Sequence, residues 1–381
     1  MASGRYDALV VGAGFAGAVL AERLASAGRR VCVIDERPHS GGIAHDHVDE
    51  AGVLCHRYGP HIFHTRALAV WTYLSRFTEW RRYEHRVMAS VDGRLVPFPV
   101  NRRTINELYG LALPDEDAMQ AFLAQRAEPR EDIVTSEDVV VARLGRDLYE
   151  RFFRGYTRKH WALDPSELDA SVCARIPVRM DEEDRWSLDP FQAMPRDGYA
   201  ALFDRMLDHP GIDLHLGVSF EDADGDIDRD LLVYTGPIDR YFGHRLGPLP
   251  YRSVEFELRR HPTPGGGLVQ PVGQLNFPGE DVPYTRTTEY RHLTGQRHDW
   301  TTIAVEHPVA EGEPCYPVPR PANRALYGRY RELAAAEKDV LFVGRLARYQ
   351  YLDMDQVVGQ ALTAFERLRR SGVVGEAREA A

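Results

Sequence analysis

A glycine-rich turn near the start of the chain constrains the fold more than any other feature of the sequence. Residues 6–11 are mainly apolar, Gly12, Gly14 and Gly17 form a G-x-G-x-x-G pattern, and apolar side chains recur with helical spacing over 18–24. This order predicts a strand, a tight turn and a helix whose N-terminus receives a pyrophosphate. Gly12 permits the turn, Gly14 lets the backbone approach a phosphate, and Gly17 lets the helix pack closely on the strand.

The residues that follow indicate which dinucleotide to expect. A second predicted strand, 30–34, ends at Asp35 and Glu36, where an acidic side chain can accept a hydrogen bond from a ribose hydroxyl. A second glycine pair, Gly41 and Gly42, comes soon after these acids. Such a pair is more typical of flavin-binding than of nicotinamide-binding folds. FAD is therefore the expected cofactor, and an ordinary βαβ turn is the alternative.

Composition and charge limit the kinds of molecule that the protein can be expected to bind. The chain has 381 residues, of which 44% are hydrophobic, so it can bury a large core and divide into two or three lobes. Its net charge of -10 disfavours nucleic acids and anionic membranes as partners. An anionic ligand must therefore meet a local cluster of arginines. The sequence has no apolar run long enough to cross a bilayer.

The cysteines indicate the cellular compartment, and the spacing of the histidines indicates whether a metal site is expected. The four cysteines are scattered without metal-site spacing, which fits reduced thiols in the cytoplasm. Five histidines between positions 45 and 64 match no zinc or iron template. These histidines are expected to donate hydrogen bonds beside an anionic cofactor, and no metal is expected.

Apolar periodicity predicts further elements. Alternation over 86–99, with Asp92–Gly93 as the turn, predicts a hairpin. Thr104 and Glu107 are expected to form a capping box, and Ser136 to cap a long helix. The core-facing stripe of that helix is expected to consist of Val140, Leu144, Leu148 and Phe152. A strand over 340–344 and a helix over 354–370 are expected to rejoin the N-terminal nucleotide fold.

Four longer motifs make the functional expectation specific. They are the stretches 58–64, 152–161, 284–286, and 344–345 with 351–355. Together they closely resemble the UDP-galactopyranose mutase family of the bacterial type, and the resemblance runs from Tyr6 to about Leu368. It implies an α/β fold in which a Rossmann-like FAD-binding domain carries an inserted helical bundle and an antiparallel β-sheet domain.

The expected domain boundaries follow this architecture. The discontinuous FAD-binding domain comprises 1–84, 192–238 and 320–381. The helical domain spans 100–191, with a mobile loop near 179–190. The antiparallel sheet domain comprises 85–99 and 239–319.

The resemblance also implies a reaction. The enzyme would be an isomerase that holds FAD non-covalently, is active with reduced flavin, and interconverts the pyranose and furanose forms of a nucleotide sugar. UDP-galactose is the expected sugar nucleotide, and the implied chemistry is attack of reduced-flavin N5 on the anomeric carbon with departure of UDP. An external reductant such as NAD(P)H and a homodimeric assembly are expected.

Residue roles carry over at matching positions only. His64, Arg175 and Arg286 resemble catalytic residues, the two arginines as a clamp on the diphosphate. Arg252 resembles an arginine that supports or gates the flavin. The expected cofactor-binding residues are Gly12, Gly14, Phe15, Ala16, Gly17, Asp35, Glu36, Arg37, Gly41, Gly42, Ile43, Tyr58, His61, His64, Arg345, Leu352, Asp353 and Met354. The expected substrate-binding residues are Asn101, Phe152, Tyr156, Thr157, Trp161, Arg175, Trp186, Asn276, Arg286, Tyr316, Tyr351 and Asp353.

Four positions depart from the family pattern. Trp186 stands where a tyrosine hydroxyl normally meets the diphosphate, and an indole can donate but not accept a hydrogen bond. His160 replaces a glutamine, Ile43 an asparagine, and Ala193 a glycine. These changes leave three alternatives open: the same chemistry on a deoxy-hexose or pentose nucleotide, a flavin oxidase of the amine-oxidase kind, and a binding protein that has lost catalysis.

Overall fold

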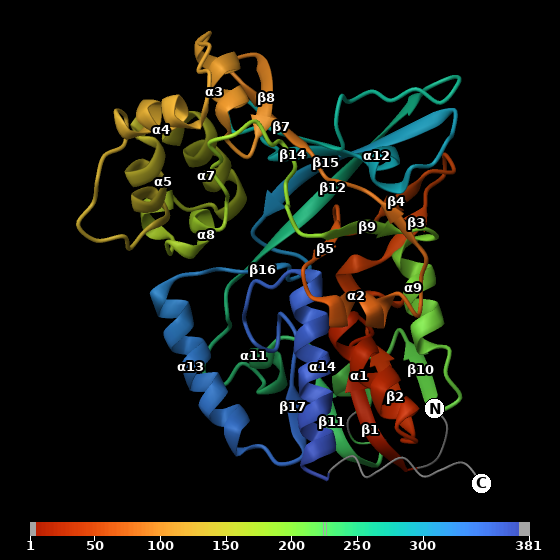
Figure 1. Ribbon diagram of the computed structural model, residues 1–381. Helices are drawn as coiled ribbons and strands as arrows, with labels where there is room; N and C mark the ends of the chain where they lie inside the picture. Colours follow the sequence, from red (N-terminus) through yellow and green to blue (C-terminus); the bar gives the residue numbers. More distant parts are fainter. Residues whose placement is uncertain (1–4, 224, 226, 373–381) are drawn as a thin grey trace.

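A parallel sheet forms the lower half of the molecule in Figure 1. The computed structural model describes residues 5–223, 225 and 227–372. The five strands run in the order β10-β2-β1-β11-β17, and every neighbouring pair is parallel. Their bounds are Tyr6–Val11 for β1, Val31–Asp35 for β2, Ile212–Leu216 for β10, Arg229–Tyr234 for β11 and Val340–Phe342 for β17. This topology confirms the Rossmann-like fold class.

Helices cover the parallel sheet. α1 (Phe15–Ser26) lies beside α14 (Met354–Arg370), so the two ends of the chain pack together as the sequence predicts (Figure 1). α9 (Gly198–Leu207) also packs on α1. The apolar core between them includes Val10, Leu20 and Val358, each fully buried. Other elements around this half are η1 (Gly42–Ala44), α2 (Leu68–Leu74), α10 (Phe220–Ala223), α11 (Ile238–Tyr241) and α13 (Pro321–Ala336).

A seven-stranded sheet lies above the parallel sheet in Figure 1, in the order β16-β12-β15-β14-β13-β7-β8. Its strands are β7 (Val87–Val91), β8 (Arg94–Phe98), β12 (Tyr251–Pro262), β13 (Gln274–Asn276), β14 (Arg286–Glu289), β15 (Trp300–Val309) and β16 (Tyr316–Pro317). All its pairs are antiparallel except β13 with β7. The β7–β8 turn is at Asp92 and Gly93, both with positive φ, as the Asp-Gly signal predicts. α12 (Tyr290–Thr294) follows β14 directly.

Two small sheets lie between the parallel sheet and the seven-stranded sheet. β9 (Phe191–Pro195) is the centre of one, with β5 (Phe63–Thr65) and β6 (Trp80–Arg82) on either side. β3 (Asp46–Val48) and β4 (Leu54–His56) form the other. Ala193 is buried in the middle of β9, opposite Phe63 and Arg82.

The helical region corrects two expectations about caps. Asn101, not Thr104, caps α3 (Arg102–Tyr109), and Thr104 is the third residue of that helix and completes the capping box. Thr135, not Ser136, caps α5 (Ser136–Leu144). In both cases the helix begins earlier than the sequence signal suggests, because more than one residue with a capping side chain precedes the apolar run.

The expected long helix is also interrupted. Gly145 has φ +81°, and a Cβ there would lie 2.1 Å from the carbonyl oxygen of Arg126, so the chain turns at this point. The chain continues as α6 (Arg146–Leu148), the π-helical η2 (Tyr149–Arg154) and α7 (Gly155–Trp161). The predicted apolar stripe is correct, because all four of its side chains are buried in one cluster. The region also contains α4 (Glu116–Ala124), η3 (Pro165–Glu167) and α8 (Ser171–Ala174).

The expected domain boundaries stay predictions, and their ends at 1–4 and 373–381 lie outside the described residues. Within the described part of the chain, no helix is long and apolar enough to cross a membrane.

Candidate active site

The phosphate-binding turn has the backbone geometry that its glycines require. Gly12 has φ +102°, and a Cβ on Gly17 would lie 1.8 Å from the Gly12 carbonyl oxygen. Gly14 caps α1 through its backbone, so the first-turn N–H groups of the helix remain available to an anion. The carboxylate of Asp35 accepts a hydrogen bond from the N–H of Ala13 at 2.8 Å and thereby holds the turn.

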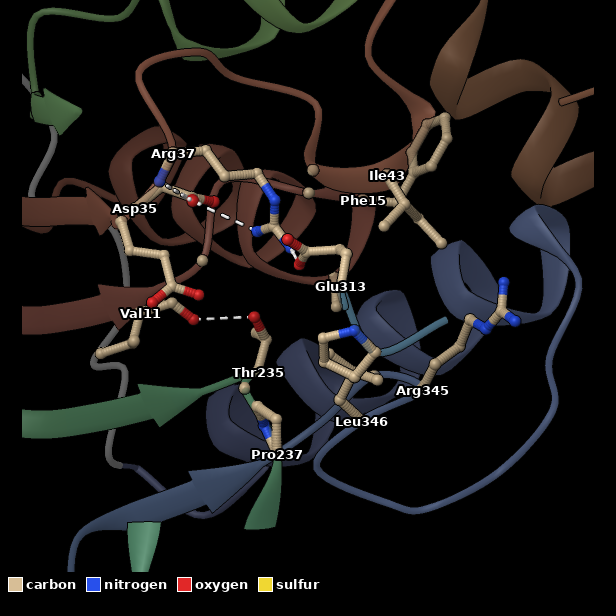
Figure 2. A pocket seen from close by; sticks show the side chains of 18 of the residues that line it. Val11, Phe15, Asp35, Arg37, Ile43, Thr235, Pro237, Glu313, Arg345 and Leu346 are labelled. Atoms are coloured by element: carbon tan, nitrogen blue, oxygen red, sulfur yellow. Dashed lines mark hydrogen bonds and ion pairs between the residues drawn. The ribbon is translucent and has the colours of Figure 1, made fainter. Parts of the chain in front are cut away.

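A cavity of about 340 Å³ opens at the C-terminal ends of four parallel strands. Its walls include residues directly after β1, β2, β11 and β17, which is where open α/β sheets bind nucleotides. Figure 2 shows Arg37 extending along this cavity toward Glu313, with which it forms an ion pair. Glu36 also lines the cavity, and Arg240 donates to its carboxylate at 2.7 Å. Both oxygens of Asp35 are engaged by the backbone of the turn, whereas the carboxylate of Glu36 is not.

Two guanidinium groups in this cavity have an unsatisfied donor. The Nε atoms of Arg37 and Arg345 are buried and have no hydrogen-bond partner among the residues that the structure describes. Both side chains line the cavity. A buried, unpaired N–H is costly, and the phosphate and carbonyl oxygens of a flavin dinucleotide are acceptors that can satisfy it. The cavity therefore fits FAD in its donors as well as in its backbone geometry.

A second cavity of about 140 Å³ adjoins the first, and both are lined by Ile43, His61, Cys315, Arg345, Leu352 and Met354. Arg286 and Tyr316 lie on its wall. The Nε of Arg286 donates to Glu306 at 2.6 Å. Burial disfavours the charge of Arg286, but Glu306 more than offsets this effect and raises the pKa of the guanidinium well above its usual value. Arg286 is therefore a permanent cation at the cavity.

Arginines gather around a pair of stacked tyrosines at this point. The rings of Tyr316 and Tyr351 are 5.5 Å apart with 12° between their planes. The guanidinium of Arg175 lies 3.9 Å from the centre of the Tyr351 ring, and that of Arg345 lies 4.9 Å from it. Burial raises the pKa of Tyr351, but the charges of Arg175 and Arg345 outweigh this effect and lower it. Such a concentration of positive charge suits a diphosphate.

Helix α7 places an aromatic wall beside this cluster. Tyr156 and His160 lie on it with their rings 12° from parallel, and His160 packs edge-on against Tyr316. Burial, together with the charges of Arg286, Arg175 and Arg252, lowers the pKa of His160 to about 3, so the imidazole is neutral near pH 7. Arg252 donates to the carbonyl of His160 at 3.1 Å. The π-helical turn directly before α7 is a feature often found at functional sites.

His64 lies on β5 and lines the second cavity. Its Nδ1 lies 2.8 Å from Oδ2 of Asp189. This contact leaves the Nε2 side of the ring for whatever the cavity binds.

The structure brings most of the predicted residues to these two cavities. Every expected cofactor-binding residue lines one of them except Gly17, which packs beneath the turn. Of the expected substrate-binding residues, Arg286, Tyr316, Tyr351 and Asp353 line the second cavity. Arg175 packs on Tyr351, and Tyr156 packs on His160, which in turn packs on Tyr316.

The other expected substrate contacts have structural partners. Asn101 is 0% exposed, and its amide accepts from the N–H of Thr104 and donates to the carbonyl of Glu183, so in this structure it caps α3. Phe152 and Trp186 pack on Phe98. Three more are buried nearby: Thr157, Trp161 in a small apolar cluster, and Asn276, which accepts from Gln274 at 2.8 Å.

Sequence reasoning missed two groups of lining residues. Thr235, Gly236 and Pro237 follow β11, and the short apolar run 231–234, typical of a buried strand, was a signal for them. Gly312 to Cys315 reach the cavity from the antiparallel sheet, and nothing local in the sequence marks them. Glu306, the partner of Arg286, was also missed.

Together, the parallel sheet, the glycine turn and the paired cavities define a flavin-dependent enzyme that acts on an anionic ligand. Comparison with known proteins then gives the family. A model described as UDP-galactopyranose mutase matches residues 151–351, and one described as an NAD(P)-binding Rossmann-like domain matches 10–77. The chain belongs to the UDP-galactopyranose mutase family, whose members are flavin-dependent mutases.

Individual relatives agree with this assignment. The chain is 37% identical to a probable UDP-galactopyranose mutase of Klebsiella pneumoniae, over 93% of this chain and 92% of the relative. It is 34% identical to a dTDP-fucopyranose mutase of Escherichia coli, over 93% and 96%. Its fold is similar to a crystal structure of reduced UDP-galactopyranose mutase, with a TM-score of 0.75, 17% identity and 98% of both chains covered. The family favours a mutase over an oxidase of the amine-oxidase kind.

Proposed function

We propose that this protein interconverts the pyranose and furanose forms of a nucleotide sugar, with UDP-galactose as the substrate. The observation that carries the proposal is the convergence of Arg175, Arg286 and Arg345 on the Tyr316–Tyr351 pair, at the place where the second cavity meets the dinucleotide cavity. A site that must hold a diphosphate beside a flavin needs this combination, whereas an amine oxidase does not.

Each group in the site has a role in this proposal. Bound FAD in its reduced form supplies the nucleophile for the anomeric carbon. Arg286 and Arg175 hold the diphosphate and balance the negative charge that grows on it as its bond to the sugar breaks. Tyr156 and His160 offer an aromatic surface to the nucleobase, and the tyrosine hydroxyls of Tyr316 and Tyr351 add polar contacts to the phosphates.

An anaerobic assay tests the proposal. Dithionite-reduced protein incubated with UDP-galactofuranose should yield UDP-galactopyranose on chromatography, and oxidised protein should not. Arg286→Ala and Arg175→Ala should each lose about 2–5 kcal/mol of transition-state stabilisation, because each removes a charge-assisted contact. Arg369→Ala is the matched control, since Arg369 pairs with Glu366 on the exposed end of α14.

Three other outcomes would contradict the proposal. Wild-type kinetics in both arginine variants would place the clamp elsewhere. Binding of the UDP-sugar without ring conversion would indicate a binding protein, and consumption of oxygen with an amine would indicate an oxidase.

A second candidate substrate is a thymidine-linked deoxy-hexose. The dTDP-fucopyranose mutase relative, at 34% identity, supports it, and so does the presence of a histidine at position 160, within the aromatic surface proposed for the nucleobase. The buried Nδ1 of His160 has no hydrogen-bond partner among the residues that the structure describes. Paired assays with UDP-galactose and dTDP-fucose distinguish the two, since the physiological substrate should have the higher kcat/KM.

The cellular setting is also a proposal. We propose that the protein works in the cytoplasm as a homodimer and receives electrons from NAD(P)H. Light scattering and anaerobic flavin bleaching by NADH or NADPH test the last two statements. A monomer, or a flavin that neither coenzyme bleaches, would contradict them.

A further inference from the structure

Asp189 connects the segment after the helical region to His64. It lies two residues before β9, and β9 pairs with β5 so that His64 is opposite Gln192. The amide of Gln192 donates to the carbonyl of Asp189 at 2.8 Å, which fixes the backbone at this point. The side chain of Asp189 is 12% exposed. Its carboxylate is thus held beside the imidazole by the sheet that also carries the imidazole.

The two oxygens of Asp189 have separate partners. Oδ2 lies 2.8 Å from Nδ1 of His64, while Oδ1 accepts from Nε and Nη2 of Arg66 at 3.1 and 2.9 Å. Burial raises the pKa of Asp189, but the hydrogen bonds from His64 and Arg66 outweigh it and lower that pKa. Asp189 is therefore an anion near pH 7. An anionic oxygen at hydrogen-bond distance can only accept, so Nδ1 of His64 must carry the hydrogen.

Ser187 is a further polar neighbour of this nitrogen. Its hydroxyl oxygen lies 3.3 Å from Nδ1 and accepts from the N–H of Asp189 at 3.1 Å. The serine contact is longer and uncharged, so it adds to the hydrogen bond with Asp189 but does not replace it.

We propose that Asp189 is a positioning residue that holds His64 in its Nδ1–H tautomer and so presents Nε2 to the flavin end of the active site as an acceptor. His64 lines the cavity, whereas Asp189 does not. A residue outside the cavity thus determines which nitrogen of His64 faces the cavity without a hydrogen, as in other sites where a carboxylate orients a histidine. The functional part of this inference rests on the proposed mutase activity, and the tautomer part does not.

The segment that carries Asp189 gives the pairing a further consequence. Upstream, its backbone is tied to the helical and sheet regions through Trp186, whose N–H donates to the carbonyl of His85 at 2.7 Å, and through Asp181, whose carbonyl accepts from the N–H of Arg102. A shift of 181–189 would therefore also move the carboxylate that orients His64. The tautomer of His64 is coupled in this way to the position of residues 181–189.

Nitrogen-15 NMR of histidine-labelled protein tests the tautomer directly, with the His64 signals identified by their loss in His64→Gln. In the wild type, Nδ1 should have the shift of a protonated nitrogen and Nε2 that of an unprotonated one. In Asp189→Ala, the Nε2–H form, which free histidine prefers, should appear. Arg66→Gln is the matched control, because it removes a partner of Asp189 but leaves the bond to His64, and its spectrum should match the wild type.

Kinetics test the functional part. Asp189→Ala should lower kcat on the order of 10- to 100-fold with little change in KM for the nucleotide sugar, and Asp189→Glu should restore part of the loss. Bound FAD and far-ultraviolet circular dichroism report whether each variant has folded. Unchanged His64 shifts in Asp189→Ala overturn the inference, as does an equal fall of kcat in Arg66→Gln. A protein inactive on nucleotide sugars contradicts the proposed function but leaves the NMR result to decide the tautomer.

Discussion

The Nε of Arg286 lies 2.6 Å from Oε2 of Glu306, and the two residues are direct cross-strand neighbours on β14 and β15. Glu306 is 2% exposed, and Arg286 is its ion-pair partner. With Nε engaged by Glu306, one terminal nitrogen of the guanidinium reaches the hydroxyl of Tyr316 at 3.4 Å. The carboxylate therefore fixes the orientation of the guanidinium, with a terminal nitrogen directed at Tyr316 on the wall of the second cavity.

Replacement of Glu306 by Gln should weaken the fold and the diphosphate site together. The change leaves Arg286 without a buried counter-charge, a loss on the order of 3 kcal/mol in the free energy of unfolding. UDP affinity should fall as well, because the guanidinium is no longer held in one orientation. Urea unfolding and calorimetric UDP titration measure the two effects. Glu257→Gln, at an exposed position of β12, is the control. If Glu306→Gln has the same free energy of unfolding and the same UDP affinity as Glu257→Gln, the prediction is contradicted.

Replacement of Asp35 should weaken FAD binding, because its carboxylate holds the phosphate turn in place. One oxygen accepts from the N–H of Ala13 and the other from the N–H of Arg37, so the carboxylate holds both sides of the phosphate turn. Asp35→Ala leaves these groups unpaired, at a cost on the order of 1–3 kcal/mol, and FAD affinity should fall by a similar amount.

Flavin fluorescence titration of the apoprotein measures this loss, with Asp213→Ala at the exposed end of the sheet as control. Glu36→Ala separates the two acids, because it should weaken FAD binding without lowering the melting temperature of the apoprotein. An Asp35→Ala protein with wild-type FAD affinity would show that the turn does not need the carboxylate.

Much of the nucleotide fold could be predicted because its signals are local. The G-x-G-x-x-G turn, the Asp92–Gly93 hairpin and the apolar stripe of α14 each depend on residues close together in sequence. Glu306 and Asp189 could not be found in this way. Their roles depend on strand register, which places Glu306 opposite Arg286 and brings the start of β9 beside His64.

Asn101 shows a different reason why a prediction from sequence can be incomplete. Its family position suggests a ligand contact, but the same amide is also the best available cap for α3, and the structure uses it there. The break at Gly145 was equally hidden, because an apolar i, i+4 stripe continues across it. Periodicity reports which side chains face the core, and it does not report whether one helix carries them all.

Acid should destabilise the protein through its buried histidines. Burial lowers the pKa of His56, His85 and His160 to about 3. Between this value and about 6.5, the unfolded chain binds protons that the folded chain excludes, so the free energy of unfolding falls as pH decreases through this range and is insensitive to these groups above it. Each histidine contributes a slope of up to about 1.4 kcal/mol per pH unit.

Urea unfolding between pH 5 and 8 measures this slope. His85→Gln should reduce the pH dependence of the free energy of unfolding by about one proton relative to the wild type. An equal slope in wild type and His85→Gln would mean that carboxylates, not this imidazole, set the acid limit.

Trp186→Tyr should affect all nucleotide sugars alike. The indole packs on Phe98, 6.1 Å between ring centres, against the apolar core of the helical region, and it does not line either cavity. The smaller phenol should leave part of this contact unfilled and cost on the order of 1 kcal/mol in the free energy of unfolding. KM should change by a similar factor for UDP-galactose and for its 6-deoxy and pentose analogues, so that their order by kcat/KM stays the same.

The competing expectation is that Trp186 fills the space of a missing sugar group. If substrate draws 179–190 over the cavity and brings the indole to the sugar, Trp186→Tyr should raise kcat/KM for UDP-galactose relative to the deoxy or pentose analogue by about 1–3 kcal/mol. Phe98→Leu is the matched variant, because it loosens the same packing without touching the indole. A changed substrate order in Trp186→Tyr but not in Phe98→Leu would make Trp186 a specificity residue, and a common change in both would make it part of the core that supports α7.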